Sequence, residues 1–131
     1  MKEEFDVIAR RFGLRLIVLF GSRAKGTAGP MSDTDVLVAG GRDLAPLQEG
    51  ELRATLSEAL AVPEDTIDLV FLESAAPLVR SEALETGTVL FGDPGMVITE
   101  RVRAWKALLD TQKFINWRRE YLAQSLTPVS V

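Results

Sequence analysis

Short apolar runs alternate along this chain with segments of helical periodicity, and this alternation limits the folds that the chain can adopt. Strand-like runs occupy residues 14–20, 33–39, 66–72 and 88–91. Apolar residues at helical spacing predict helices over residues 5–12, 46–60, 74–86 and 97–126. The pattern predicts an α/β (α+β) layer fold with one central sheet of about four strands flanked by helices.

The length of 131 residues corresponds to about one domain. We expect residues 1–95 to form its core and residues 96–131 to form a long C-terminal helix of the same single domain.

The chain has neither cysteine nor histidine, and this restricts the chemistry open to it. Without cysteine there are no disulfides, thiolate zinc sites or cysteine nucleophiles. Without histidine the commonest general base and the commonest metal ligand are both absent. Any catalysis therefore depends on carboxylates, hydroxyls, Lys, Arg or backbone dipoles, and a bound metal would be a hard ion such as Mg²⁺ or Mn²⁺.

The formal net charge is −4, but the charge is unevenly distributed. Residues 1–99 hold nine basic and sixteen acidic residues, whereas residues 100–131 hold six basic and three acidic ones. The acidic balance argues against a general nucleic-acid binder. The N-terminus lacks the apolar core of a signal peptide, and no apolar run approaches the ~20 residues that span a bilayer, so we expect a cytoplasmic protein.

The connection between the first two predicted strands contains the residue types of a phosphate-binding site. A strand runs directly into Gly21, and glycine lets the backbone approach a ligand closely. The hydroxyl of Ser22, the N–H groups that follow, Arg23 and Lys25 can together bind an anion. We therefore predict that these four residues bind a nucleotide. Taken alone, they also fit an ordinary turn with a serine N-cap and two solvated cations.

Three aspartates complete this candidate site. Asp33 and Asp35 open the second predicted strand two residues apart, so they share a face and repel each other unless a cation neutralises them. Asp68 lies in the apolar third strand, where a lone carboxylate is costly unless it is paired or coordinated. If these strands are neighbours, the three carboxylates fit a two-metal site for nucleotidyl transfer. Asp33 and Asp35 would bridge the metals, and Asp68 would be a metal ligand, the general base or both.

Each aspartate also has a simpler explanation. Asp33 can cap a turn after Ser32, and Asp68 can pair with Arg15 or with another basic residue at the buried edge. All of these explanations must hold together before the set can be understood without a site, so we favour the site.

The spacing of these residues resembles a family signature. A Gly-Ser pair at 21–22, ten further residues, an Asp-Thr-Asp run at 33–35 and a later aspartate at 68 resemble the DNA polymerase beta nucleotidyltransferase superfamily. The fuller run GSRAKG…SDTDVLV is similar to the minimal nucleotidyltransferases, the MNT partners of HEPN-domain proteins in prokaryotic toxin–antitoxin pairs. The resemblance covers residues 12–91 and includes the Leu-Phe-Gly at 90–92. Lys25 stands where arginine is usual, and Thr34 where isoleucine is common.

The resemblance implies a nucleotidyltransferase fold with a mixed sheet, and two Mg²⁺ ions on Asp33, Asp35 and Asp68. It also implies triphosphate contacts from Gly21 and Ser22. Such proteins can transfer AMP from ATP to a tyrosine of the HEPN toxin and so silence its ribonuclease. The resemblance therefore predicts an antitoxin that acts on a HEPN-type helical partner.

Two other functions stay open. The chain ends one predicted helix past the core, so it has little surface for an acceptor pocket of its own. A macromolecular acceptor fits this best, but a small molecule such as an aminoglycoside, held across a dimer, would also fit. A non-catalytic module that neutralises its partner by contact is the third possibility.

The predicted C-terminal helix is rich in aromatic residues. We expect Val102, Trp105 and Leu109 to pack on the domain as a stripe. Further apolar residues occupy more than one face and alternate with cations: Phe114, Ile115, Trp117, Tyr121 and Leu122 with Lys113, Arg118 and Arg119. Large apolar patches usually mark an interface, so we expect a contact with a partner protein or a second copy. Folding back onto the body and contact with single-stranded nucleic acid are the alternatives.

Overall fold

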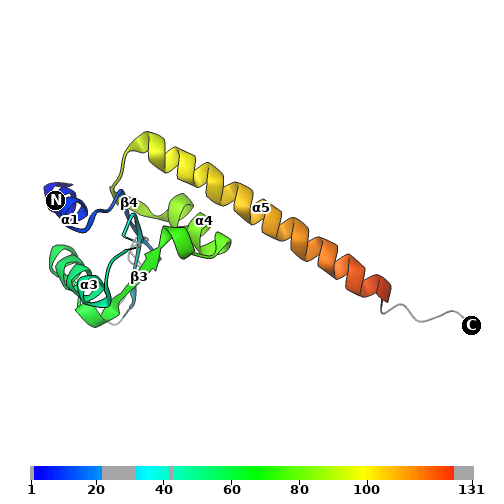
Figure 1. Cartoon of the computed structure of the whole chain (residues 1–131), viewed down its shortest axis with the longest axis horizontal. Helices are drawn as coiled ribbons and strands as arrows, with labels where there is room; N and C mark the ends of the chain where they lie inside the picture. The colour runs from blue at the N-terminus through cyan, green and yellow to red at the C-terminus, as the bar shows by residue number, and fades with distance from the viewer. Residues whose placement is uncertain (1, 22–31, 42, 126–131) are drawn as a thin grey trace, which may run out of the picture.

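The computed structural model describes residues 2–21, 32–41 and 43–125. It shows a body of helices and strands from which one long helix projects (Figure 1). The helices are α1 (Lys2–Phe12), α3 (Pro46–Leu60), α4 (Pro77–Thr86) and α5 (Pro94–Ser125). The strands are β1 (Leu16–Phe20), β2 (Thr34–Ala39), β3 (Ile67–Phe71) and β4 (Thr88–Phe91), with the 3₁₀ turns η1 (Glu64–Thr66) and η2 (Leu72–Ser74) beside β3.

The strands form one mixed sheet in the order β3-β2-β1-β4. β1 is antiparallel to β2 and to β4, whereas β2 and β3 are parallel. The C-terminal end of β1 and the N-terminal ends of β2, β3 and β4 therefore lie at the same edge of the sheet. This result confirms the predicted mixed sheet and the predicted neighbourhood of the second and third strands.

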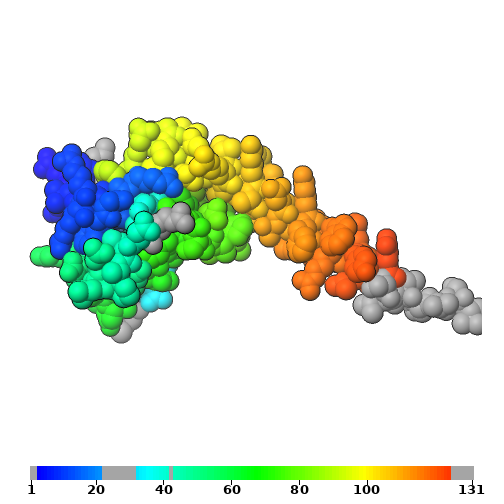
Figure 2. All heavy atoms as spheres, viewed as in Figure 1, coloured from blue at the N-terminus to red at the C-terminus, as the bar shows by residue number. Residues whose placement is uncertain are grey.

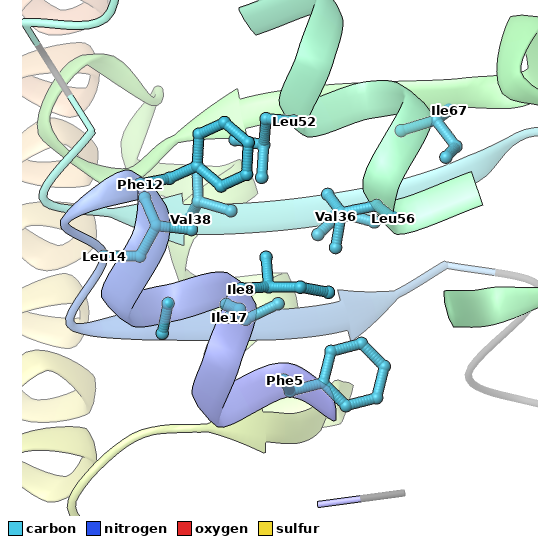
Figure 3. Packing of buried hydrophobic residues seen from close by; sticks show 11 residues of the cluster. Phe5, Ile8, Phe12, Leu14, Ile17, Val36, Val38, Leu52, Leu56 and Ile67 are labelled. Atoms are coloured by element: carbon cyan, nitrogen blue, oxygen red, sulfur yellow. The ribbon is translucent and has the colours of Figure 1, made fainter. Parts of the chain in front are cut away.

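Helices cover both faces of the sheet. On one face, α1 and α3 pack Phe5, Ile8, Phe12, Leu52 and Leu56 against Ile17, Val36, Val38 and Ile67 (Figure 3). On the other face, α4 and α5 cover Leu16, Val18, Phe20, Leu37 and Ala39. β1 and most of β2 are thus buried from both sides. Each fully buried Val, Leu or Ile stabilises the fold by about 1.5–3 kcal/mol relative to exposure.

Local sequence signals explain most element ends. α1 has acidic residues in its first turn and basic ones in its last, and it ends at Gly13, whose φ of +68° suits glycine. α3 begins with Pro46 at its first turn, where Gln48 Oε1 accepts a hydrogen bond from the N–H of Ala45 at 2.9 Å. α4 begins three residues later than predicted, because Ser74 belongs to η2 and the two alanines that precede Pro77 are extended.

The prediction for the first half of α5 was wrong about which face packs. Val102, Trp105 and Leu109 are 45%, 58% and 44% exposed, so they do not form a buried stripe. The helix instead buries Val97 and Ala104 against the face that α4 covers. A small residue such as Ala104 lets two helices approach closely, and the larger Trp105 then points away.

Polar contacts reinforce this packing. The Arg101 Nε donates to the Leu84 carbonyl of α4 at 2.9 Å. The buried Glu100 accepts from Arg15 at 3.2 Å and from Arg103 at 3.1 Å. α5 is thereby fixed to the body through its first three turns. Among residues 2–21, 32–41 and 43–125, the structure contains no helix with an apolar stretch that could span a bilayer.

Candidate active site

The candidate site lies where β1 ends and β2 and β3 begin. In the antiparallel register of β1 and β2, Phe20 is opposite Asp35. In the parallel register of β2 and β3, Asp35 is opposite Asp68. Gly21 follows β1 directly, and Asp33 precedes β2 directly. The pairing of adjacent strands, about 4.8 Å apart, brings the three aspartates to one sheet edge, as predicted.

The alternation of side chains places these carboxylates on one face of the sheet. Asp35 shares the face of Leu37 and Ala39, which α4 and α5 cover. Asp68 shares a face of β3 with Val70, which packs against the same buried cluster. Thr34 points to the opposite face, where it is buried and its Oγ1 lies 3.4 Å from the Oγ1 of Thr66. The acidic face is therefore the one that α4 covers.

Gly21 fits closely against Asp35. Its φ of +77° lies in the left-handed region, which L side chains rarely adopt. A Cβ at this position would collide with the Asp35 Oδ2. Only glycine therefore allows the chain that leaves β1 to pass this close to the carboxylate.

The site concentrates negative charge. Burial raises the pKa of Asp35 above its ordinary value, and the nearby carboxylates of Asp68, Asp33 and Glu82 raise it further, in that order. A bound cation would remove this repulsion, and carboxylate oxygens are the donors that Mg²⁺ and Mn²⁺ prefer. Within the ranges that the structure describes, however, no three acidic side chains converge on one point as a formed metal site. The carboxylates of Asp33, Asp68 and Glu82 nevertheless lie close enough to act on Asp35 electrostatically.

The sequence did not indicate Glu82, which α4 brings close to this acidic face. Residues 83 and 84 of α4 are buried against the face that carries Asp35, and β4 follows the helix with Thr88 opposite Leu19 of β1. The C-terminal end of α4 therefore lies at the edge where the aspartates gather. Glu82 is exposed and lies on an ordinary helix, so no local pattern singles it out. Only the packing of α4 places it near Asp35.

The structure contradicts the proposed pairing of Asp68 with Arg15. Arg15 precedes β1, at the opposite end of the sheet from Gly21. Its guanidinium lies 3.2 Å from Glu100 and 3.6 Å from Glu73. The other predicted ligands, Ser22, Arg23 and Lys25, lie outside the described residues.

With this geometry established, comparison with known proteins identifies the class. The model of the family described as polymerase beta nucleotidyltransferase matches residues 5–94. The chain therefore belongs to the polymerase beta nucleotidyltransferase family. This membership confirms the resemblance inferred from the Gly-Ser and Asp-Thr-Asp spacing.

The relatives of this chain include a protein adenylyltransferase. Over 89 residues the chain is 32% identical to the protein adenylyltransferase MntA of Aphanizomenon flos-aquae. That match covers 63% of this chain and 59% of the relative, so the chain spans less than two thirds of that protein's length.

Two solved structures are similar over almost the whole chain. A chain of a toxin–antitoxin complex with AMP-PNP has a TM-score of 0.67 and 24% identity, covering 97% of this chain and 98% of that one. A chain of the complex between the tri-AMPylated Shewanella oneidensis HEPN toxin and its MNT antitoxin has a TM-score of 0.61 and 22% identity, covering 97% and 96%. At these identities the likeness establishes a shared fold, and that fold includes the long C-terminal helix.

Proposed function

We propose that this chain is a Mg²⁺-dependent nucleotidyltransferase that moves AMP from ATP to a hydroxyl of a HEPN-type helical protein and so acts as its antitoxin. The observation that carries this proposal is the register of Asp35 against Asp68 beside Gly21, with Asp33 two residues before Asp35. Family membership supports nucleotidyl transfer as the reaction. The MntA relative is a protein adenylyltransferase, which supports AMP as the transferred group and a protein as the acceptor.

The three aspartates would share the work of the site. Asp33 and Asp35 would hold both metal ions, and Asp68 would hold one of them. Bound Mg²⁺ would supply charge neutralisation of the triphosphate and a lowered pKa of the attacking hydroxyl.

The chain's own residues would perform the remaining steps. Gly21 keeps the backbone close to Asp35, and the Ser22 hydroxyl with Arg23 and Lys25 would bind the triphosphate. The acceptor oxygen forms a bond to the α-phosphorus while the bond to pyrophosphate breaks, and the hydroxyl proton passes to the carboxylate of Asp68. A carboxylate suits this role because the chain has no histidine.

The experiment is a transfer assay. The purified chain is incubated with α-labelled ATP, Mg²⁺ and a HEPN-type protein, and label on that protein is measured. We expect labelling by the wild type and by Asp110→Asn, which removes an exposed carboxylate of α5, and none by Asp35→Asn. Equal labelling by wild type and Asp35→Asn, or labelling by neither with any nucleoside triphosphate, would contradict the proposal.

A further inference from the structure

The last four turns of α5 leave the body of the protein. From Leu109 to Gln124 every residue is exposed, and Ala104 is the last buried residue that the structure describes in this helix. At about 1.5 Å per residue, this distal segment (residues 109–124) extends roughly 24 Å from the body. Figure 2 shows it standing clear of the other elements.

Aromatic rings form a row along the distal segment. Phe114, Trp117 and Tyr121 are spaced to lie on one face of the helix and are 59%, 60% and 59% exposed. The ring centroids of Phe114 and Trp117 are 6.1 Å apart, and those of Trp117 and Tyr121 are 5.7 Å apart and stacked. The rings already pack against one another, so their side chains lose little rotamer entropy when a partner covers them.

A second row continues this surface. Ile115 and Leu122 are 43% and 45% exposed, and with Phe114, Arg118 and Arg119 they line a shallow groove. Tyr, Trp and Arg are the residues most enriched at the energetic centres of protein interfaces. A helical segment of this length is marginally stable alone in water, so covering these rows would also stabilise the helix.

The charge of the distal segment indicates what covers it. Lys113, Arg118 and Arg119 outnumber Asp110 and Glu120, whereas residues 1–99 are strongly acidic. Two copies of this segment would each bring a net positive charge to the contact, which disfavours a second copy of this helix as the occupant. An acidic partner would be repelled by the body and attracted to the end of α5.

We propose that the distal segment docks the acceptor protein, through an apolar and acidic face of that protein. The inference rests on the proposed function for the identity of the acceptor. The family model ends at residue 94, so α5 lies outside the part that defines the transfer chemistry. Its first turns pack on α4, which covers the acidic face of the site. The helix is therefore an arm that begins at the helix layer over the site and carries the docking surface.

The test compares two faces of the same helix. Phe114→Ala/Trp117→Ala/Tyr121→Ala removes the aromatic row, and Gln112→Ala/Asn116→Ala/Glu120→Ala alters another face. Alanine favours the helix in both variants. Calorimetry with the HEPN-type protein of the transfer assay measures the Kd, and the labelled-ATP assay is run at partner concentrations below and above this Kd. We expect the Kd to rise at least 100-fold for the aromatic variant, with labelling restored at high partner concentration, and to change less than 3-fold for the control.

Separate outcomes distinguish the two proposals. Binding and transfer are measured separately. If Asp35→Asn binds the HEPN-type protein with the wild-type Kd, the docking proposal holds even when the wild type transfers no label. A lack of transfer then contradicts only the function proposed for the aspartate site. The docking proposal is overturned if the wild type does not bind this protein or if the aromatic variant binds it equally well. It is also overturned if sedimentation shows that the wild type is a dimer and the aromatic variant a monomer. Binding of a fluorescent single-stranded RNA by the aromatic row, in place of the protein, would overturn it as well.

Discussion

Asp35 of β2 lies directly opposite Asp68 of β3 in a parallel register, and both face the layer formed by α4. Two neighbouring strands thus place two carboxylates side by side, with Asp33 two residues away. No folding requirement explains this arrangement, because burial and like charge both oppose the ionised form of Asp35. The fold accepts this electrostatic cost at the edge where a ligand can compensate for it.

This cost predicts how stability depends on pH without metal. Because the pKa of Asp35 is raised from 3.8, the folded state binds the proton more tightly than the unfolded state. The stabilising contribution of protonated Asp35 is therefore present below pH ~4 and is lost as pH rises through the folded pKa. We expect Asp35→Asn to increase the free energy of unfolding at pH 7 in EDTA, relative to wild type, but not at pH 3.5. Urea unfolding measures this, and a variant less stable than wild type at pH 7 would contradict it.

Binding of Mg²⁺ should remove the repulsion between Asp35 and the neighbouring carboxylates. A ligand at 100 times its Kd stabilises the folded state by about 2.7 kcal/mol, so Mg²⁺ should raise the Tm of the wild type. We expect Asp35→Asn and Asp68→Asn to lose this shift, and Asp110→Asn to retain it. Differential scanning calorimetry with and without Mg²⁺ provides the measurement, and an equal shift in all four proteins would place the ion elsewhere.

The sequence predicted the elements better than their contacts. The helix over residues 46–60 and the strand over 88–91 match α3 and β4, because periodicity and flanking Pro or Gly are local signals. The parallel pairing of Asp35 with Asp68 was only a condition in the sequence argument, since strand order is not encoded locally. Glu82 and the packing face of α5 were missed for the same reason. Whether Ala104 or Trp105 faces α4 depends on the shape of the neighbouring surface.

Gly21 should be intolerant of any side chain. Gly21→Ala places a methyl group in a left-handed conformation, at a cost of about 1–2 kcal/mol, and against the Asp35 carboxylate. We expect a lower free energy of unfolding and a loss of label transfer. Gly50→Ala is the matched control, because a Cβ there meets nothing within 4 Å and alanine favours the interior of α3 by about 0.5–1 kcal/mol. Chemical unfolding of both variants should give opposite signs, and two equal losses would refute the close fit at Gly21.

Glu100 should anchor the arm formed by α5. Its carboxylate is only 9% exposed and accepts from Arg15, next to β1, and from Arg103 on the same helix. A hydrogen bond to a charged group contributes about 1.5–3 kcal/mol, so Glu100→Gln should lower the free energy of unfolding by an amount of this order. Glu120→Gln, on the exposed distal segment, should leave it unchanged. If Glu100→Gln unfolds at the wild-type urea concentration, the anchor lies instead in the apolar contacts of Val97 and Ala104.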